Sequence, residues 1–190
     1  MIPQNKIIII TAPSGAGKTS ITRYLLQQFP ELQFSISAAT RTPRNDEVSG
    51  KDYYFMSLEA FQQKIAEEAF IEWEMVYEGK YYGTLKTEIN RIWEMNKIPL
   101  LDIDVKGALH VQKQFPHHCL SIYIQAPSVE ELKKRLESRG SETPESIQTR
   151  ISKAMYEMSF KENFDALIVN DRLHNAQQEA EELVRRFITQ

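Results

Sequence analysis

The sequence predicts an α/β fold built on a five-stranded parallel sheet flanked by helices. Four short apolar runs, near residues 6–11, 98–103, 119–124 and 166–169, and one alternating stretch at 34–38 are the candidate strands. Segments with helical spacing of apolar residues lie between them, and strands that alternate with helices form parallel sheets with right-handed crossovers. Ligands of such sheets bind at the carboxyl ends of the strands.

The composition is that of a globular protein. The chain has 190 residues, of which 42% are hydrophobic and 26% charged, which suits one domain with insertions. A formal net charge of −3 argues against sequence-independent binding to nucleic acid. No apolar run approaches the roughly eighteen residues of a membrane span, and no cleavage-site pattern is present near the N-terminal isoleucines. Cys119 is the only cysteine, so we expect a cytoplasmic protein without an intrachain disulfide.

The strongest motif is the stretch IIIITAPSGAGKT at residues 7–19. Its unbroken β-branched run predicts a strand buried on both faces. Gly15 and Gly17 allow successive backbone N–H groups to converge on phosphate oxygens, next to the positive end of a helix. In the pattern GxxxxGK[ST], the lysine, here Lys18, contacts the β- and γ-phosphates, and the hydroxyl, here of Thr19, ligates Mg²⁺.

This motif departs from the pattern at one position. Ala12 replaces the first glycine, and we expect its small side chain to be tolerated in an ordinary backbone conformation. A chance glycine-rich turn is the alternative, but the preceding strand and the following helix favour a phosphate-binding loop. The candidate phosphate-binding residues are Ala12, Pro13, Ser14, Gly15, Ala16, Gly17, Lys18 and Thr19.

A helix is predicted directly after this loop. It starts near Lys18, carries Ile21, Leu25 and Phe29 at intervals of four, and is closed by Pro30.

The next fifty residues differ in character, because their strands alternate and punctuating Pro and Gly are frequent. The predicted elements are a strand at 34–38, a polar loop at 40–52, a strand at 53–56, a helix at 58–69, and a hairpin over 70–77 and 80–82. Ser57 is the expected N-cap of that helix. Residues 35–84 therefore predict a small mixed subdomain inserted into the main sheet.

The main fold resumes with a helix whose apolar stripe is Leu85, Ile89, Ile92 and Trp93. The elements predicted after it are a strand at 98–103, helices at 106–115 and 128–139, a helix from 143, a strand at 166–169, and a final helix carrying Ala176, Ala180, Leu183, Val184 and Phe187.

Turn and cap signals bound the two helices between residues 128 and 158. Ser128 and Glu131 form a capping box, and Gly140 ends the first helix. Thr143 precedes Pro144 as the cap of the second helix. Its apolar stripe is predicted to pack in the core and consists of Ile147, Ile151, Met155 and Met158.

Asp102 and Asp104 are candidate metal-site residues. They lie two apart at the end of a predicted strand, so we expect their side chains on one face, at the edge of the sheet that holds the phosphate loop. A Mg²⁺ ion bound to the phosphates needs a nearby carboxylate, which contacts the ion directly or through water. An ordinary turn after a strand is the alternative. The four histidines lack the spacing of metal ligands, and we expect them at the surface.

Arginines form two further candidate groups. Arg41 and Arg44 flank a proline in the polar loop and suit a bidentate grip on a second phosphate, although a solvated cluster has the same pattern. Tyr53 and Tyr82 could donate hydroxyls to that phosphate, although tyrosines in a core are common.

The second arginine group surrounds a short loop. Arg135 and Arg139 lie four apart on one predicted helix, and Arg150 lies on the next. Such a loop could close over a transferring phosphoryl group, although each arginine alone is more often a surface ion-pair partner.

With these residues in view, the chain resembles the guanylate kinase family from Ile7 to the final helix. The motifs that carry the resemblance are APSGAGKT, SISAATRTPR followed by GKDYYF, FIEWEMVYEGKYYGT, LLDIDVKG, ELKKRLESRGSETPESIQTRI and IVND. It departs from the usual family residues at Ala12, Thr84, Lys106 and Asn45-Asp46.

The resemblance implies a P-loop nucleoside monophosphate kinase fold in a single domain. The core would comprise residues 1–34, 85–126 and 160–190, the inserted GMP-binding subdomain residues 35–84, and the helical lid residues 127–159. The implied reaction is Mg²⁺-dependent transfer of the γ-phosphoryl group of ATP to GMP, and also to dGMP, in purine nucleotide metabolism.

The resemblance also assigns roles to residues. Arg41, Arg44, Tyr53 and Tyr82 would hold the GMP phosphate, and Ser37, Glu72, Thr84 and Asp104 would recognise guanine. Lys18, Arg44, Arg135, Arg139 and Arg150 would act on the transferring phosphoryl group. Thr19 and Asp102 would serve Mg²⁺, and Asn170 would approach the adenine of ATP.

Glu72 suits guanine chemically. An ionised carboxylate accepts from guanine's N1–H and 2-amino group, whereas adenine presents an acceptor at N1. A buried acceptor left empty is costly, so discrimination of ~10⁴ is available.

Two alternatives remain open from the sequence. A guanylate-kinase-like binding module would be expected to have an eroded phosphate loop, whereas Lys18 and Thr19 are present here. Another small P-loop phosphotransferase would lack Arg41, Arg44 and Glu72 in these positions. The expected partners are ATP and GMP, without nucleic acid or membrane. The sequence does not specify an oligomeric state.

Overall fold

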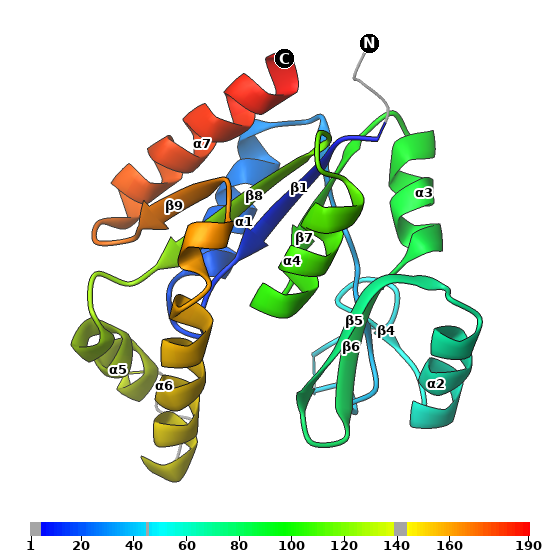
Figure 1. Cartoon of the computed structure of the whole chain (residues 1–190), viewed down its shortest axis with the longest axis horizontal. Coiled ribbons are helices and arrows are strands. Elements are labelled where there is room, and N and C mark those ends of the chain that lie inside the picture. The colour runs from blue at the N-terminus through cyan, green and yellow to red at the C-terminus, as the bar shows by residue number, and fades with distance from the viewer. Residues whose placement is uncertain (1–4, 45, 139–143) are drawn as a thin grey trace.

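The structure is a computed structural model that describes residues 5–44, 46–138 and 144–190. Over these ranges the chain forms a parallel sheet with helices on both faces and a smaller second sheet (Figure 1). No helix in the described part of the chain is long and apolar enough to cross a bilayer.

The main sheet is parallel throughout, as the sequence predicts. Its strands, in spatial order, are β2 (Leu32–Phe34), β7 (Ile98–Asp102), β1 (Ile7–Thr11), β8 (Cys119–Gln125) and β9 (Ala166–Val169). The central strand β1 has fully buried isoleucines, which explains why its sequence shows no polar alternation.

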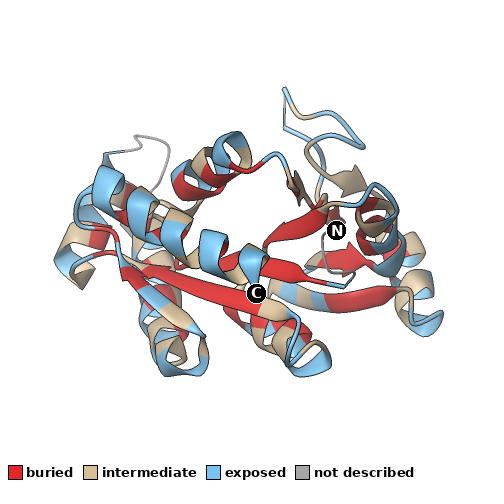
Figure 2. Cartoon of the chain, turned by 90° about the horizontal axis from the view of Figure 1, so that it is seen from above, coloured by how far each residue is buried: buried red, intermediate tan, exposed pale blue. Residues whose placement is uncertain are grey.

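Successive isoleucines of β1 face opposite sides of the sheet. Ile8 and Ile10 pack in a core with the helices of one face, and Ile7 and Ile9 pack in a second core with those of the other face. The first face carries α1 (Lys18–Gln28) and α7 (Leu173–Thr189), and the second carries α3 (Lys86–Glu94) and α4 (Val105–Gln114). Figure 2 shows the strands as a buried layer between helices.

The second sheet has four strands and its own core. In spatial order they are β4 (Tyr54–Phe55), β3 (Ala38–Ala39), β6 (Lys80–Leu85) and β5 (Phe70–Tyr77). Helix α2 (Leu58–Ala66) covers it, with Ser57 accepting a hydrogen bond from the amide of Ala60 as the predicted N-cap. The rings of Phe61 and Phe70 stack with centroids 4.4 Å apart in this core.

The remaining described elements are α5 (Val129–Glu137), α6 (Pro144–Met158) and a 3₁₀ turn (Lys161–Asn163). In Figure 1, α5 and α6 project from the same end of the parallel sheet as the β5–β6 hairpin, on the opposite side of the molecule. Ser128 caps α5 by accepting from the amide of Glu131, as the capping box predicts. The predicted turn residues Gly140 and Thr143 lie outside the described residues.

The strand predicted at 34–38 is wrong, because two short strands occupy this stretch in different sheets. Strand β2 ends at Phe34, and β3 begins at Ala38. The alternating pattern is present, but alternation does not reveal where a strand changes its partners.

Helix α2 also ends three residues earlier than predicted. It stops at Ala66 because Glu68 has a φ of 51°, a left-handed conformation that no helix continues.

One member of the predicted core stripe of α6 is wrong. Met155 is 58% exposed, whereas Ala154 is 1% exposed and Ile151 8%. The next buried residue after Ile151 is therefore three positions on, at Ala154, whereas the predicted stripe continued four positions on, at Met155. Both spacings are compatible with one face of a helix.

Removing the ring of Phe61 should destabilise the smaller sheet. We expect Phe61→Ala to lower the free energy of unfolding by about 3–5 kcal/mol, because a buried stacked ring is replaced by a cavity. Urea denaturation followed by circular dichroism measures the change. Val48, 55% exposed, provides the control, since Val48→Ala should change stability by less than about 0.5 kcal/mol. Equal effects of the two substitutions would contradict the prediction.

Candidate active site

Four separate parts of the chain line one cavity of about 360 Å³. The phosphate loop and the start of α1 form one wall, with residues 12–15 and 17–20. Tyr53 and Tyr82 of the predicted insertion, Asp104 after β7 and Arg150 of α6 line the rest of it. The structure therefore brings the phosphate loop, the predicted insertion and a predicted lid arginine to the same space.

A second cavity of about 160 Å³ adjoins the first. Lys18, Tyr53, Tyr82 and Asp104 line both cavities. The residues that it adds from the predicted sites are Ser37, Glu72 and Asp102. The candidate guanine-recognition residues are thus next to the phosphate loop.

The glycines of the phosphate loop are required by backbone conformation and by space. Gly15 and Gly17 have φ values of 93° and 98°, which side-chain-bearing residues rarely adopt. A Cβ at Gly17 would collide with the amide of Asn170, and a Cβ at Gly15 would press on leucines of α5. Ala12 is absent from the described non-glycine residues with positive φ, so alanine is accommodated there without strain.

Lys18 lies at the start of α1 and forms an ion pair with Asp102 at the end of β7. Its Nζ is 2.5 Å from Oδ1 of Asp102 and 3.4 Å from the carbonyl oxygen of Ile103. Burial alone would lower the pKa of Lys18, but the charge and hydrogen bond of Asp102 and the charge of Asp104 outweigh it and raise that pKa. Lys18 is therefore cationic at neutral pH.

Thr19 and Asp102 offer a set of oxygen donors beside Lys18. Both border a further cavity that also includes Lys18, Arg44 and Tyr53. One hydroxyl and one carboxylate, with Asp102 about one-fifth exposed, fit Mg²⁺, which prefers oxygen ligands and brings waters and phosphate oxygens of its own. Among the described residues, no group of three or more His, Cys, Asp or Glu side chains could hold a metal alone.

The prediction that Asp102 and Asp104 share a strand face is wrong. Strand β7 ends at Asp102, and Asp104 is the N-cap of α4. Its Oδ1 accepts from the amide of Gly107 at 2.8 Å, which satisfies an otherwise unpaired N–H of the first turn. Asp104 nevertheless lines both cavities.

Glu72 is a buried carboxyl on β5. It is 4% exposed, and its Oε1 accepts from the hydroxyl of Thr84 on the neighbouring strand at 2.6 Å. Burial is the main reason that the pKa of Glu72 rises to about 8, with the charge of Asp104 adding to it and the bond from Thr84 opposing it. A Cβ at Gly107 would contact Oε2 of Glu72, so α4 packs closely against this carboxyl.

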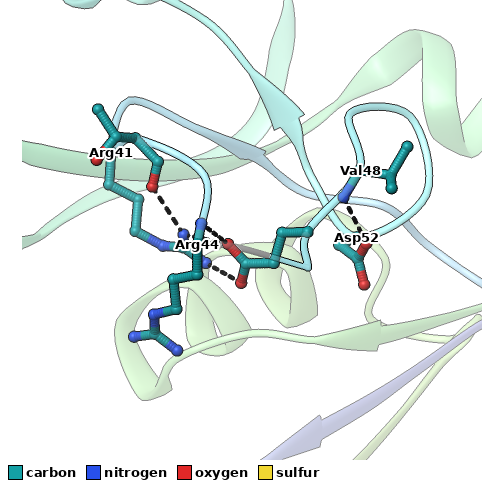
Figure 3. Close-up of polar contacts among 6 residues, drawn as sticks. Arg41, Arg44, Val48 and Asp52 are labelled. Carbon is teal, nitrogen blue, oxygen red and sulfur yellow. Dashed lines mark hydrogen bonds and ion pairs between the residues drawn. The ribbon is translucent and has the colours of Figure 1, made fainter.

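The guanidinium of Arg41 forms an ion pair with the carboxylate of Glu47. Its two terminal nitrogens donate to the two carboxylate oxygens of Glu47, at 2.5 and 2.6 Å, and its guanidinium lies over the ring of Tyr53 at 4.8 Å. Glu47 also accepts from the backbone amide of Arg44 (Figure 3). These bonds from Arg41 and Arg44 lower the pKa of Glu47 to about 2.

The arginines of α5 and α6 have different partners. Arg150 donates to the hydroxyl of Ser14 in the phosphate loop at 2.7 Å. Arg135 donates to Glu131 and to the backbone carbonyl of Asn170, both at 3.0 Å. Arg139 lies outside the described residues.

Asn170 forms a hydrogen bond with the phosphate loop. Its side chain is buried at the end of β9 and donates to the carbonyl of Ala16 at 2.8 Å. The amide group is thus engaged with the loop, and a contact with adenine stays a prediction. The side chain of Thr84 is also buried, and its hydroxyl donates to Glu72.

Several cavity residues are absent from the predicted set. Lys153 and Glu157 follow Arg150 at helical spacings of three and seven on α6, and Lys153 lies 3.5 Å from Glu157. Glu74 follows Glu72 by two on β5 and lines the second cavity. Helix and strand periodicity around the predicted residues would have identified all three.

Comparisons with known proteins place this chain in a family. The sequence model described as guanylate kinase matches residues 4–187. The guanylate kinase of Bacteroides fragilis is 43% identical over 183 residues, covering 96% of this chain and 90% of the relative. That of Salinibacter ruber is 43% identical over 188 residues, covering 99% and 100%.

A solved structure agrees with these relatives. The crystal structure of guanylate kinase from Anaplasma phagocytophilum superposes with a TM-score of 0.80 at 27% identity, covering 100% of this chain and 89% of the other. The P-loop nucleoside monophosphate kinase fold expected from the resemblance is thereby confirmed. The chain belongs to the guanylate kinase family.

Proposed function

We propose that this enzyme transfers the γ-phosphoryl group of ATP to the phosphate of GMP, giving ADP and GDP, and that dGMP is also accepted. The observation that carries the proposal is the shared space between the phosphate loop, the candidate guanine-recognition residues and Arg150. Two nucleotides bound there would meet with their phosphates facing each other.

We propose that the chain consists of three regions with different roles. The core comprises residues 1–34, 85–126 and 160–190, the GMP-binding insertion residues 35–84, and the lid residues 127–159. The separate apolar core of the smaller sheet supports an insertion that behaves as a unit. The position of α5 and α6 across from the β5–β6 hairpin in Figure 1 supports a lid.

ATP would bind at the phosphate loop. Backbone N–H groups of residues 14–18 and the N-terminus of α1 would cradle the β- and γ-phosphates, with Lys18 as the nearest cation. Thr19 and Asp102 would hold Mg²⁺, directly or through its waters. When bound, Mg²⁺ neutralises phosphate oxygens and fixes their geometry.

GMP would bind between the insertion and β7. Ser37, Glu72, Thr84 and Asp104 would recognise guanine, with Thr84 acting through its bond to Glu72. Arg41, Arg44, Tyr53 and Tyr82 would hold the phosphate. Arg41 has five N–H groups, of which Glu47 accepts two, so the guanidinium would be shared between that carboxylate and the GMP phosphate.

Transfer itself needs little proton chemistry. A phosphate oxygen of GMP is already anionic near neutral pH, so no general base is required. Lys18, Arg44, Arg135, Arg139 and Arg150 would align the groups and stabilise charge on the transferring phosphoryl. Arg150 already lies beside the phosphate loop, because its guanidinium donates to the hydroxyl of Ser14 at 2.7 Å.

The acceptor nucleotide is the sharpest test of the proposal. Release of ADP from ATP and Mg²⁺ should be fast with GMP and negligible with AMP, UMP or dTMP, measured in parallel by a coupled assay. Turnover with AMP but not with GMP would overturn the substrate assignment. Tight GMP binding without any turnover would instead favour a binding module.

Replacing Lys18 should abolish turnover while leaving the fold intact. We expect Lys18→Ala to lower kcat about 100- to 1000-fold, because charge stabilisation at the transferring group is lost. The melting temperature should change little, since the ion pair with Asp102 is partly solvated. Lys133→Ala on the exposed side of α5 is the control and should leave both quantities unchanged. Parallel losses of kcat and melting temperature would argue for a structural role.

GMP binding should release a proton from Glu72. Because the pKa of Glu72 is about 8, this carboxyl is mostly protonated at neutral pH and must ionise to accept from guanine. GMP affinity should therefore rise about tenfold between about pH 7 and pH 8.5 and then level off. Calorimetry in buffers of different ionisation enthalpy measures both affinity and proton release. Glu72→Gln, which cannot ionise, should bind more weakly and lose this proton release. Release that persists in the variant would contradict the assignment.

A further inference from the structure

Glu88 is a buried carboxylate without a role in the proposed reaction. It lies in the first turn of α3, directly after the strand that carries Thr84, and is 2% exposed. Burying a carboxylate without partners costs free energy, so the hydrogen-bond partners of Glu88 indicate what it contributes there.

Each carboxylate oxygen of Glu88 accepts two hydrogen bonds. Oε1 accepts from the backbone amide of Ile36 at 3.0 Å and from Nη2 of Arg91 at 2.8 Å. Oε2 accepts from the hydroxyl of Tyr54 at 2.9 Å and from Nε of Arg91 at 2.9 Å. Arg91 belongs to the same helix, whereas Ile36 and Tyr54 belong to two other segments.

Those two segments carry residues of the GMP site. Ile36 precedes Ser37, and Tyr54 follows Tyr53. The amide of Tyr54 also donates to the carbonyl of Ser37 at 2.9 Å. Glu88 therefore fastens both segments to α3 at positions adjacent to the side chains that enter the second cavity.

The charge state of Glu88 suits this contact. Burial would raise its pKa, but the bonds from Arg91, Ile36 and Tyr54 together outweigh burial and lower it. The carboxylate is consequently ionised at neutral pH, where it accepts from all of these donors.

We propose that Glu88 is a positioning residue for the acceptor nucleotide, holding Ser37 and Tyr53 at the spacing that GMP requires. The inference rests on the proposed GMP site and extends it to a side chain that does not touch the nucleotide. Its loss should affect GMP binding and leave ATP binding alone, because the phosphate loop has no bond to Glu88.

The test compares nucleotide affinities of variants with those of the wild-type enzyme. Glu88→Ala should weaken GMP binding about tenfold by removing both cross-segment bonds, and Tyr54→Phe should weaken it less by removing one. Adding Tyr54→Phe to Glu88→Ala should cost nothing further, because the shared bond is already lost. Calorimetry with GMP alone and with ATP alone provides the dissociation constants, below the melting temperature of each variant.

A conservative variant separates positioning from packing. Glu88→Gln retains a carbonyl for the amide of Ile36 and an N–H₂ group that can donate to the hydroxyl of Tyr54, but that group also meets the Nε–H donor of Arg91. Glu88→Gln should therefore bind GMP more tightly than Glu88→Ala and more weakly than the wild type. Glu94→Ala, on the exposed side of the same helix, is the matched control and should bind both nucleotides like the wild type.

The outcomes distinguish this inference from the GMP site on which it rests. If Tyr53→Phe weakens GMP binding but Glu88→Ala does not, Glu88 has no positioning role. If Glu88→Ala weakens GMP and ATP binding equally, or lowers only the melting temperature, its role is structural. If neither Tyr53→Phe nor Ser37→Ala affects GMP binding, the assigned site itself is wrong.

Discussion

The position of β1 at the centre of the parallel sheet determines where the site forms. Its isoleucines are buried on both faces, so the strand is held between β7 and β8 with its carboxyl end beside theirs. Ile10 of β1 pairs with Asp102 of β7, and the phosphate loop leaves β1 immediately afterwards. This register brings Lys18 and Asp102 together as an ion pair. The burial of apolar side chains in the sheet therefore determines where these charged groups lie.

Glutamates near the site show how surroundings set the charge of one chemical group. Glu47 accepts from Arg41 and is strongly acidic. Glu72 has no cationic partner in the described part of the chain, and its pKa is about 8. Glu88 is buried but ionised because Arg91 donates to it. The same mildly acidic chain can therefore bind two anionic nucleotides, since these three carboxyl groups are neutralised by arginine or by protonation.

The sequence predicts most of the fold because strong local patterns and tertiary structure agree. The phosphate loop, four of the five parallel strands and the helix caps at Ser57 and Ser128 are local features with a direct physical cause. The change of sheet between Phe34 and Ala38 depends on partners distant in sequence, as does the ion pair of Arg41 with Glu47. Asp104 was misplaced because an aspartate after a strand fits both a strand end and a helix cap.

The contact between Asn170 and the phosphate loop has a thermodynamic consequence. The amide of Asn170 donates to the carbonyl of Ala16, and leucine side chains of α5 lie close to Gly15. The loop is thus ordered when the chain folds, and the entropy of ordering it is lost before a nucleotide arrives. The free energy of phosphate contacts remains available for affinity and for orienting the reacting groups.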